Sequence, residues 1–427
     1  MRIIDCQAPG FDKALSSLVV GIHQIPKNVM QRAEKIFQEV ASKGDSALFG
    51  WTNKLEKHRV SKKTVKVGPR EMIEALGDMP GQDLKVIRLA AKRIRAFHRK
   101  QAALGFRFDD GKGTVIEERV MPLDRVGICI PGGRAPLAST VLMTAIPATL
   151  AGVKEIIMIS PWPEGRMNPH VLAAAQIAGV DEVYKVGGIQ GVAALACGTQ
   201  SIPRTDKIVG PGSIWVAAAK TIAASRGLCG IDLVAGPSEI VVVADGMAKP
   251  GLAAIDLLSQ AEHGLDSIAV LVTTSRKLAD KVQAELLRAA QESGIPKREL
   301  KGVFAVLVRN LEQAARVVNE IAPEHLEVMV RQPRQFAKKV FNAASIFLGP
   351  YSPVPAGDYM AGANHVLPTG GTARFSSPLG VHDFVKRQSI TELSPEALKS
   401  ISRATARFAE IEGLPAHARA IRKRFPE

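Results

Sequence analysis

Between residues 126 and 235, a short apolar run, a glycine-rich turn and a helical stretch recur four times. The runs that we interpret as strands are 126–130, 155–160, 183–186 and 207–209. Strands that alternate with helices in this way form a parallel sheet with helices on both faces. This rhythm constrains the chain more than any other feature, and it predicts one α/β domain over 126–235.

A second α/β series follows the first, with strand candidates at 239–244, 268–273, 303–308 and 345–348. Helical periodicity dominates the first quarter, and a mostly helical, basic tail follows Phe384. Because 427 residues exceed what one ordinary core holds, we expect two domains with smaller appendages. The predicted fold class is α/β, with two parallel-sheet domains of incomplete Rossmann type and helical N- and C-terminal extensions.

The basic balance of the chain does not by itself indicate a nucleic-acid partner. The formal net charge is +15, but Lys and Arg are spread along the chain and aromatic residues make up only 5%. Nucleic-acid binding favours a basic stripe interleaved with aromatics. We therefore expect a solvated basic surface, which would also attract an anionic cofactor such as a dinucleotide. A basic nucleic-acid-binding protein on an enzyme scaffold is the remote alternative.

Cysteine usage and the N-terminus indicate the cytoplasm. The four cysteines form no CxxC pair, which is typical of a protein kept reduced; they are Cys6, Cys129, Cys197 and Cys229. Asp5 and Asp12 interrupt the N-terminus before the apolar region of a signal peptide could develop. The most apolar stretch, 138–153, is short for a membrane span and contains Pro147, so we expect no membrane segment.

Three glycine turns follow predicted strands of the first series, at 131–133, 187–188 and 210–212. Ligands of parallel sheets bind where strand ends meet helix N-termini, and glycine lets a phosphate approach the backbone N–H groups there. None of the turns is the GxGxxG dinucleotide fingerprint, because Trp215 stands where a third glycine after 210–212 would fall. A nucleotide-sized ligand and simple tight turns are both open at this point.

Two short segments bring together side chains with metal or proton chemistry. Gln260 and His263 are three residues apart near the end of a predicted helix, so they share one face and could hold half of a metal site. Glu324 and His325 lie between a helix and a strand, and both side chains can transfer protons near neutral pH. A polar helix end and a solvated loop are the structural alternatives.

Two further segments carry carboxylates and imidazoles toward the C-terminus. Residues 357–371 form a long glycine-punctuated stretch with Asp358 and His365 and no obvious packing face, which is typical of a functional loop. Glu412 and His417 lie in the basic tail, where a solvated helix surface is the ordinary interpretation.

Five strings of the sequence together resemble the histidinol dehydrogenase family. They are Ala235-Gly-Pro-Ser-Glu239, Ser259-Gln-Ala-Glu-His263, Pro323-Glu-His-Leu-Glu327, Asn364-His-Val-Leu-Pro-Thr369 and Glu412-Gly-Leu. They follow the order and spacing of that family, from the first long helix to His417. The resemblance implies a zinc-dependent, four-electron oxidation of L-histidinol to L-histidine via histidinal, with two NAD⁺.

The resemblance also implies a role for each matched residue. The zinc ligands are Gln260, His263, Asp358 and His417, and the acid–base pair is Glu324 and His325. The substrate contacts are the same four ligands with Ser238, His325 and Glu412. The NAD contacts are Cys129, Gln190 and Ser213. The chain departs from the family at two of these, since Tyr is common at the position of Cys129 and Asn at that of Ser213.

An intertwined homodimer is a further implication, in which Glu412 and His417 complete the active site of the other subunit. The expected division is an N-terminal arm at 1–27, a catalytic and metal-binding domain at 28–125 with 236–380, an NAD-binding domain at 126–235 and a dimerisation tail at 381–427. In the implied mechanism His325 removes the hydroxyl proton in each oxidation, and Glu324 activates water for the aldehyde step.

Two other enzyme interpretations stay open. A paralogue could oxidise another amino alcohol or a polyol with the same metal and cofactor. An aldehyde could instead be oxidised as a thiohemiacetal on Cys129 or Cys197, which lie near glycine-rich segments but have no neighbouring His in the sequence.

Overall fold

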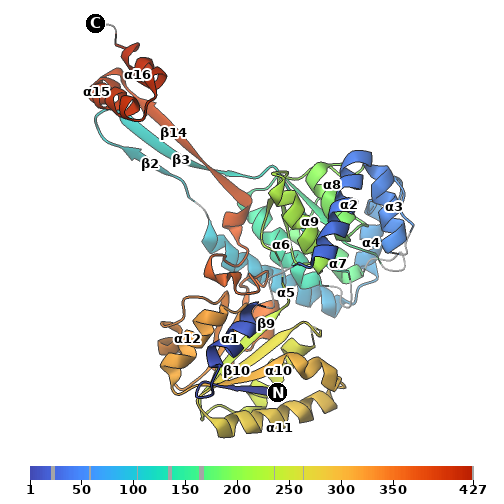
Figure 1. Cartoon of the computed structure of the whole chain (residues 1–427). Helices are drawn as coiled ribbons and strands as arrows, with labels where there is room; N and C mark the ends of the chain where they lie inside the picture. The colour runs from blue at the N-terminus through green and yellow to red at the C-terminus, as the bar shows by residue number, and fades with distance from the viewer. Residues whose placement is uncertain are drawn as a thin grey trace.

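Two parallel sheets, each covered by helices, make up the body of the protein, and an antiparallel ribbon projects from it (Figure 1). The computed structural model describes residues 1–20, 25–56, 59–102, 104–132, 137–162, 168–234, 236–262 and 264–425. No helix within these segments is long and apolar enough to cross a membrane.

The six-stranded sheet contains the second α/β series. Its strands pair in parallel in the order β1 (Arg2–Asp5), β11 (Val303–Leu307), β10 (Ile268–Thr273), β9 (Glu239–Ala244), β12 (His325–Met329) and β13 (Ser345–Leu348). One face is covered by α10 (Pro250–Ala261) and α11 (Arg276–Glu292), the other by α1 (Phe11–Val20) and α12 (Leu311–Ile321). The N-terminal segment thus supplies this sheet with an edge strand and a helix.

The five-stranded sheet confirms the rhythm predicted over 126–235. Its strands pair in parallel in the order β6 (Glu182–Tyr184), β5 (Glu155–Ile159), β4 (Arg125–Cys129), β7 (Lys207–Val209) and β8 (Gly230–Ile231). One face packs on α6 (Ala138–Ala151) and α7 (Pro169–Ala178), the other on α8 (Gly188–Cys197) and α9 (Ile214–Ser225). Only β8, two residues long, has no counterpart among the predicted strands.

The helical first quarter adds a second layer of helices to this five-stranded sheet. α2 (Lys27–Lys43) and α3 (Asp45–Leu55) pack on α8 and α9, and α4 (Pro69–Gly77) and α5 (Gly81–His98) pack on α6 and α7. The apolar face of α2 explains the first contact, because Ile36 and Phe37 are fully buried in the same cluster as Leu195. The helices of the first quarter thus pack against the helices that cover the five-stranded sheet.

The antiparallel ribbon is the part of the fold that the sequence did not predict. It pairs β2 (Phe106–Asp109) and β14 (Val385–Leu393) on either side of β3 (Thr114–Pro122), and it carries α15 (Pro395–Ile411) and α16 (Pro415–Arg422) at its tip (Figure 1). We call this ribbon with its two helices the arm. The tail expected to be mostly helical thus begins with a nine-residue strand.

Short helical segments complete the chain. They are η1 (Arg99–Gln101), η3 (Lys297–Gly302), α13 (Pro333–Ala337), α14 (Val354–Ala356), the π turn η4 (Gly357–Ala361), η5 (Thr372–Arg374) and η6 (Val381–Phe384). The stretch 357–371, expected as a functional loop, contains η4 and packs against α5 through it. It therefore lies next to helices that cover the five-stranded sheet as well as next to β12.

Candidate active site

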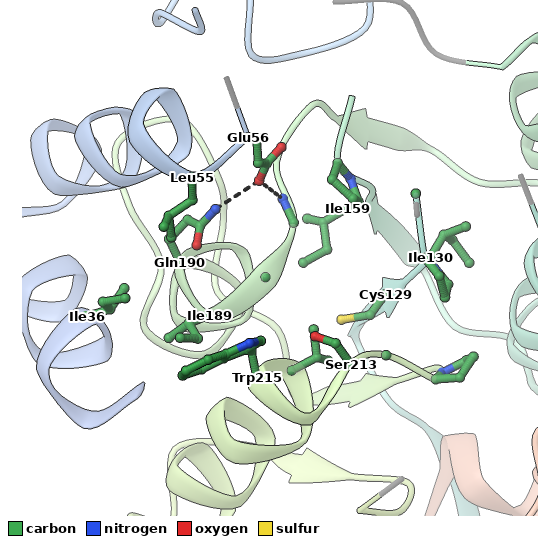
Figure 2. A pocket seen from close by; sticks show the side chains of 18 of the residues that line it. Ile36, Leu55, Glu56, Cys129, Ile130, Ile159, Ile189, Gln190, Ser213 and Trp215 are labelled. Carbon is green, nitrogen blue, oxygen red and sulfur yellow. Dashed lines mark hydrogen bonds between the residues drawn. The ribbon is translucent and has the colours of Figure 1, made fainter. Parts of the chain in front are cut away.

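A cavity of about 450 Å³ opens at the carboxyl edge of the five-stranded sheet (Figure 2). Its lining comes from the segments that directly follow β4, β5, β6 and β7, including Pro131, Pro161, Gly187 and Pro211. Ligands of open parallel sheets bind at this edge, because strand ends and helix N-termini converge there. All three predicted glycine turns reach the cavity, although Gly133 lies outside the described residues.

The three residues expected to contact the cofactor all line this cavity (Figure 2). Cys129 is the buried last residue of β4, and Gln190 lies buried in the first turn of α8. Ser213 is exposed at the N-cap of α9, and its side chain makes no capping hydrogen bond. The fold therefore brings together residues that are widely separated in the sequence.

A buried ion pair holds the turn that precedes α9. Gly210 has φ of +108°, and a Cβ there would approach the carbonyl oxygen of Cys129 to 2.4 Å, so only glycine fits. The Gly210 N–H donates to Asp232 Oδ2 at 2.7 Å, and Lys220 Nζ donates to the Gly210 carbonyl at 3.1 Å. Lys220 and Asp232 also pair directly, with side chains only 1% and 2% exposed. The N-terminus of α9 is thus fixed before any ligand binds.

The thiols of Cys129 and Cys197 are poorly suited to act as nucleophiles. Burial raises the pKa of Cys129 to about 12, and nearby Lys220 only partly offsets this effect. Burial also raises the pKa of Cys197. Because the thiolate is the reactive form, both side chains stay as thiols near neutral pH. This observation counts against the thiohemiacetal route.

Glu56, which no motif indicated, reaches the cavity from the C-terminal end of α3. Its Oε1 accepts the Gly187 N–H and the Gln190 Nε2–H, each at 2.8 Å (Figure 2). Burial raises the pKa of this carboxyl to about 7, although the hydrogen bonds from Gly187 and Gln190 act in the opposite direction. Its partners lie more than a hundred residues along the chain, so no local sequence pattern could have revealed it.

A second group of functional side chains lies at the start of β12, in the six-stranded sheet. Helix α12 ends at Ala322, whose φ of +52° is the only positive value among the described non-glycine residues. The chain then turns into β12, which places Glu324 and His325 in buried positions between β9 and β13. His325 Nδ1 lies 3.7 Å from Glu324 Oε2, and Nε2 lies 3.7 Å from Asp358 Oδ1.

The two carboxylates determine the protonation of His325. Burial alone lowers the pKa of the imidazole, but Glu324 and Asp358 outweigh it and raise the value to about 9. Burial likewise raises the pKa of Glu324, with His325 acting in the opposite direction. The geometry therefore places a strongly basic imidazole beside a carboxyl whose affinity for a proton is also increased.

Glu239 is a further residue that sequence reasoning missed. It exchanges hydrogen bonds with Glu324: the Glu239 N–H donates to Glu324 Oε2 at 3.0 Å, and the Glu324 N–H donates to Glu239 Oε1 at 3.2 Å. The Glu239 carbonyl lies 3.3 Å from His325 Nδ1. Burial and the charge of Glu324 raise the pKa of Glu239 to about 7. These contacts fix both members of the Glu–His pair.

The expected metal ligands are only partly brought together. Gln260 is buried on α10, Asp358 lies in η4 beside His325, and His263 falls outside the described residues. His417 is exposed on α16 at the tip of the arm, and α16 lies far from the six-stranded sheet of the same chain (Figure 1). Among the described residues, no three His, Cys, Asp or Glu side chains are grouped closely enough to hold a metal ion.

The remaining expected substrate contacts are divided in the same way. Ser238 is half-buried and directly precedes β9, next to Glu239. Glu412 is exposed at the end of α15, on the arm. Within one chain, Ser238 thus lies near His325, whereas Glu412 and His417 are exposed on the arm, far from His325.

A cavity at the carboxyl edge of one parallel sheet and a buried acid–base pair on the other are the arrangement of an α/β enzyme. The family model for histidinol dehydrogenase matches residues 23–425. The chain belongs to the histidinol dehydrogenase family and is an oxidoreductase.

Individual relatives agree with this assignment over the whole chain. A histidinol dehydrogenase from Syntrophotalea carbinolica is 44% identical over 431 residues, covering 100% of both chains. One from Listeria monocytogenes is 45% identical over 406 residues, covering 93% of each. A crystal structure of histidinol dehydrogenase from Elizabethkingia anophelis superimposes with a TM-score of 0.92 at 33% identity, covering 99% of this chain and 98% of that one.

Proposed function

We propose that this protein oxidises L-histidinol to L-histidine by way of histidinal, in a zinc-dependent reaction that uses two NAD⁺. The observation that carries the proposal is the buried Glu324–His325 pair, with Asp358 3.7 Å from the imidazole. An alcohol oxidation needs a base for the hydroxyl proton, and an aldehyde oxidation also needs water to be activated. The pair offers one group for each task.

Each member of the pair has a defined role in this mechanism. His325 in its neutral form accepts the hydroxyl proton of the alcohol as a hydride leaves the carbon. It passes this proton to solvent and then accepts a second proton, from the hydrated aldehyde, as the second hydride leaves. Glu324 takes a proton from the water that adds to the aldehyde carbon, a task favoured by the raised pKa of its buried carboxyl. Glu239 keeps Glu324 in place through its N–H at 3.0 Å.

The donor set fits zinc. One amide, one carboxylate and two imidazoles are suitable ligands for Zn²⁺, and we propose Gln260, His263, Asp358 and His417 for these positions. Gln260 Nε2 is buried without a hydrogen-bond partner among the described residues, so no hydrogen bond through this atom fixes which way the amide faces, and the amide oxygen is the atom that would bind Zn²⁺. When bound, the metal would supply a template for the substrate's nitrogen atoms.

The cavity on the five-stranded sheet fits a dinucleotide. Cys129, Gln190 and Ser213 line it, and its glycine turns allow close approach to the backbone at the N-terminus of α9. When bound, NAD⁺ would accept a hydride in each oxidation. The protein's part is to hold it on a rigid edge: the buried pair of Lys220 and Asp232 fixes the turn at Gly210.

The arm supports a homodimer with shared active sites. Glu412 and His417 line a groove between α15 and α16 together with apolar side chains such as Phe408 and Leu414. Phe408 is 63% exposed and Ile411 68% exposed, which is costly for a helix pair that stands alone. A second copy of the chain would cover this surface and receive the two polar side chains in its own site. The four cysteines are unpaired, which fits the cytoplasm that we propose as the enzyme's location.

Optical detection of NADH tests this function directly. Purified protein should form two equivalents of NADH per L-histidinol, lose turnover when its metal is removed, and recover it with Zn²⁺. A matched reaction with a simple amino alcohol in place of histidinol checks substrate choice. Normal turnover by fully demetallated protein would contradict the zinc assignment, and turnover with the other alcohol alone would favour a paralogue.

A further inference from the structure

Two buried acceptor atoms in the cavity have no hydrogen-bond donor among the described residues. They are Oε2 of Glu56 and Oε1 of Gln190. Gln190 is only 1% exposed, and its orientation is fixed because its Nε2–H is already donated to Glu56 Oε1 at 2.8 Å. A buried acceptor without a donor is costly, so a ligand that brings O–H or N–H groups to these atoms is favoured.

The N-terminus of α8 already carries a negative charge from the protein. Gly187 is its N-cap, and the Gly187 N–H donates to Glu56 Oε1 at 2.8 Å. Helix N-termini attract phosphate, but a phosphate here would meet the carboxylate that already occupies the site. By contrast, α9 begins at Ser213 without a side-chain cap, so its N-terminus is available to a diphosphate.

The strand order places Glu56 at the end of the cavity away from the catalytic pair. Gly187 follows β6, the edge strand on one side of the sheet, whereas β8, on the opposite edge, is the strand that precedes β9 and Glu239 in the sequence. A dinucleotide that presents its nicotinamide to His325 therefore extends its adenosine toward Glu56. Apolar side chains surround this end and suit an adenine ring: Ile36, Leu55, Ile189 and Trp215 (Figure 2).

We infer that Glu56, held by Gln190, is the residue that makes this enzyme select NAD over NADP. The inference rests on the proposed use of NAD in this cavity. The two cofactors differ only at the adenosine ribose, where NAD has a free vicinal diol and NADP a 2′-phosphate. A diol supplies two O–H donors for the two open acceptors. A phosphate supplies acceptors and negative charge, so it is repelled by the Glu56 carboxylate.

The charge on Glu56 depends on pH in the accessible range. Its pKa is raised to about 7 by burial, against the hydrogen bonds from Gly187 and Gln190. Two cations face this region: Arg32 of α2, which lines the cavity and lies over the Trp215 ring, and Lys185, which lies over Trp162 and pairs with Glu71. Above pH 7 the carboxylate is present and discrimination is strongest; below it the carboxyl is neutral and discrimination weakens.

Calorimetric titration of the purified protein with NAD⁺ and NADP⁺ tests this role without relying on turnover. At pH 8 the wild type should bind NAD⁺ at least roughly tenfold more tightly than NADP⁺, and Glu56→Gln should remove most of that difference. Glu56→Gln keeps the shape and the acceptor for Gly187 and Gln190. The matched control is Glu34→Gln on α2, an exposed carboxylate paired with Arg226, which should leave the ratio unchanged.

Repeating the titrations at two pH values separates an effect of the Glu56 charge on cofactor selection from a structural effect of the substitution. The 2′-phosphate itself titrates near pH 6, so the effect is measured as the difference between the wild type and Glu56→Gln at pH 8 and pH 6.5. This difference should shrink at the lower pH as Glu56 takes up its proton. A Glu56→Gln ratio equal to that of the wild type at pH 8 would overturn the inference, and so would a difference that does not change with pH.

One additional variant distinguishes two negative outcomes: a wrong role for Glu56 and a wrong cofactor site. Ser213→Trp fills the mouth of the cavity from an exposed position, so it should abolish binding of NAD⁺ while the circular dichroism spectrum stays unchanged. If NAD⁺ binds equally well to Ser213→Trp, the cofactor does not use this cavity and the proposed site fails. If Ser213→Trp blocks binding and Glu56→Gln leaves the ratio unchanged, only the role of Glu56 fails.

Discussion

The two α/β sheets differ in how much of a functional site each completes within one chain. The five-stranded sheet has a cavity on which the expected contacts Cys129, Gln190 and Ser213 all converge. The six-stranded sheet holds Glu324 and His325 through their contacts with Glu239, yet the expected ligand His417 is on the arm. Under the proposed function, cofactor binding is therefore a property of the single subunit, whereas catalysis needs His417 from a second copy of the chain.

The most severe test removes the proposed base and leaves the cavity intact. His325→Asn should lower both oxidations by roughly 10²–10⁴-fold, because no other group accepts the hydroxyl proton. NAD⁺ affinity, measured by calorimetry, should stay at the wild-type value, since the cavity belongs to the other sheet. A parallel loss of NAD⁺ binding would contradict the independence of the two sites.

The next test removes the buried ion pair that fixes the turn at the edge of the cavity. Lys220→Met leaves Asp232 charged and buried without its cation, which should cost about 3–5 kcal/mol of unfolding free energy. Chemical denaturation followed by circular dichroism measures it. The control is Lys154→Met, since Lys154 pairs with Asp124 on the surface and should contribute less than about 1 kcal/mol. Equal effects would mean that the buried pair does not stabilise the turn.

A third test separates the two oxidation steps that we propose for the Glu324–His325 pair. Glu324→Gln should lower histidinal oxidation by about 10²-fold and histidinol-to-histidinal oxidation much less, because only the aldehyde step needs activated water. Single-turnover measurements with each substrate give the two rates. Equal losses on both substrates would rule out this division of tasks between Glu324 and His325.

The smallest expected effect is the activity recovered when two inactive variants share active sites in a mixed dimer. His263→Ala and His417→Ala should each be inactive, but after joint dissociation and reassociation about half of the dimers are mixed. Each mixed dimer has one intact site of two, so activity should return to about a quarter of the wild-type value. A mixture that stays inactive, despite proven subunit exchange, would mean that each arm serves its own subunit.

The sequence predicted those parts of the molecule whose signals are local. Alternating strands and helices indicated both sheets, and a buried strand such as β9 stands out as a continuous apolar run. The ribbon was missed because β14 pairs with β3 from Val385 opposite Pro122, across most of the chain. In addition, β14 is largely exposed and β3 is only half-buried, so neither strand has a fully buried face. Without a burial pattern or a nearby turn, nothing local indicates such a pairing.

In the candidate site, too, the sequence predicted the residues that have a local signal and missed those that depend on long-range contacts. Gln260, Glu324, His325 and Asp358 lie in or beside strings that resemble a known family, so the sequence alone was enough to propose them. Glu56 lies in none of these strings, and its contact with Gly187, 131 residues away, depends on the folded arrangement. Glu239 ends one of the strings, but its role was missed because its contact with Glu324, 85 residues away, appears only in the folded chain. Acidic side chains are common, and only their burial makes these two exceptional.

The length of the ribbon determines how far the tip of the arm lies from the body of the protein. Its two long strands pair over nine positions, from Thr114 opposite Leu393 to Pro122 opposite Val385, which at about 3.3 Å per residue spans roughly 30 Å. If His417 serves a second subunit, that span sets how far the imidazole reaches. A flexible tether would tolerate added residues, but here a matched deletion of two residues from both strands would retract the tip by about 7 Å with its facing preserved. The arm's length is therefore as closely constrained as the position of any ligand it carries.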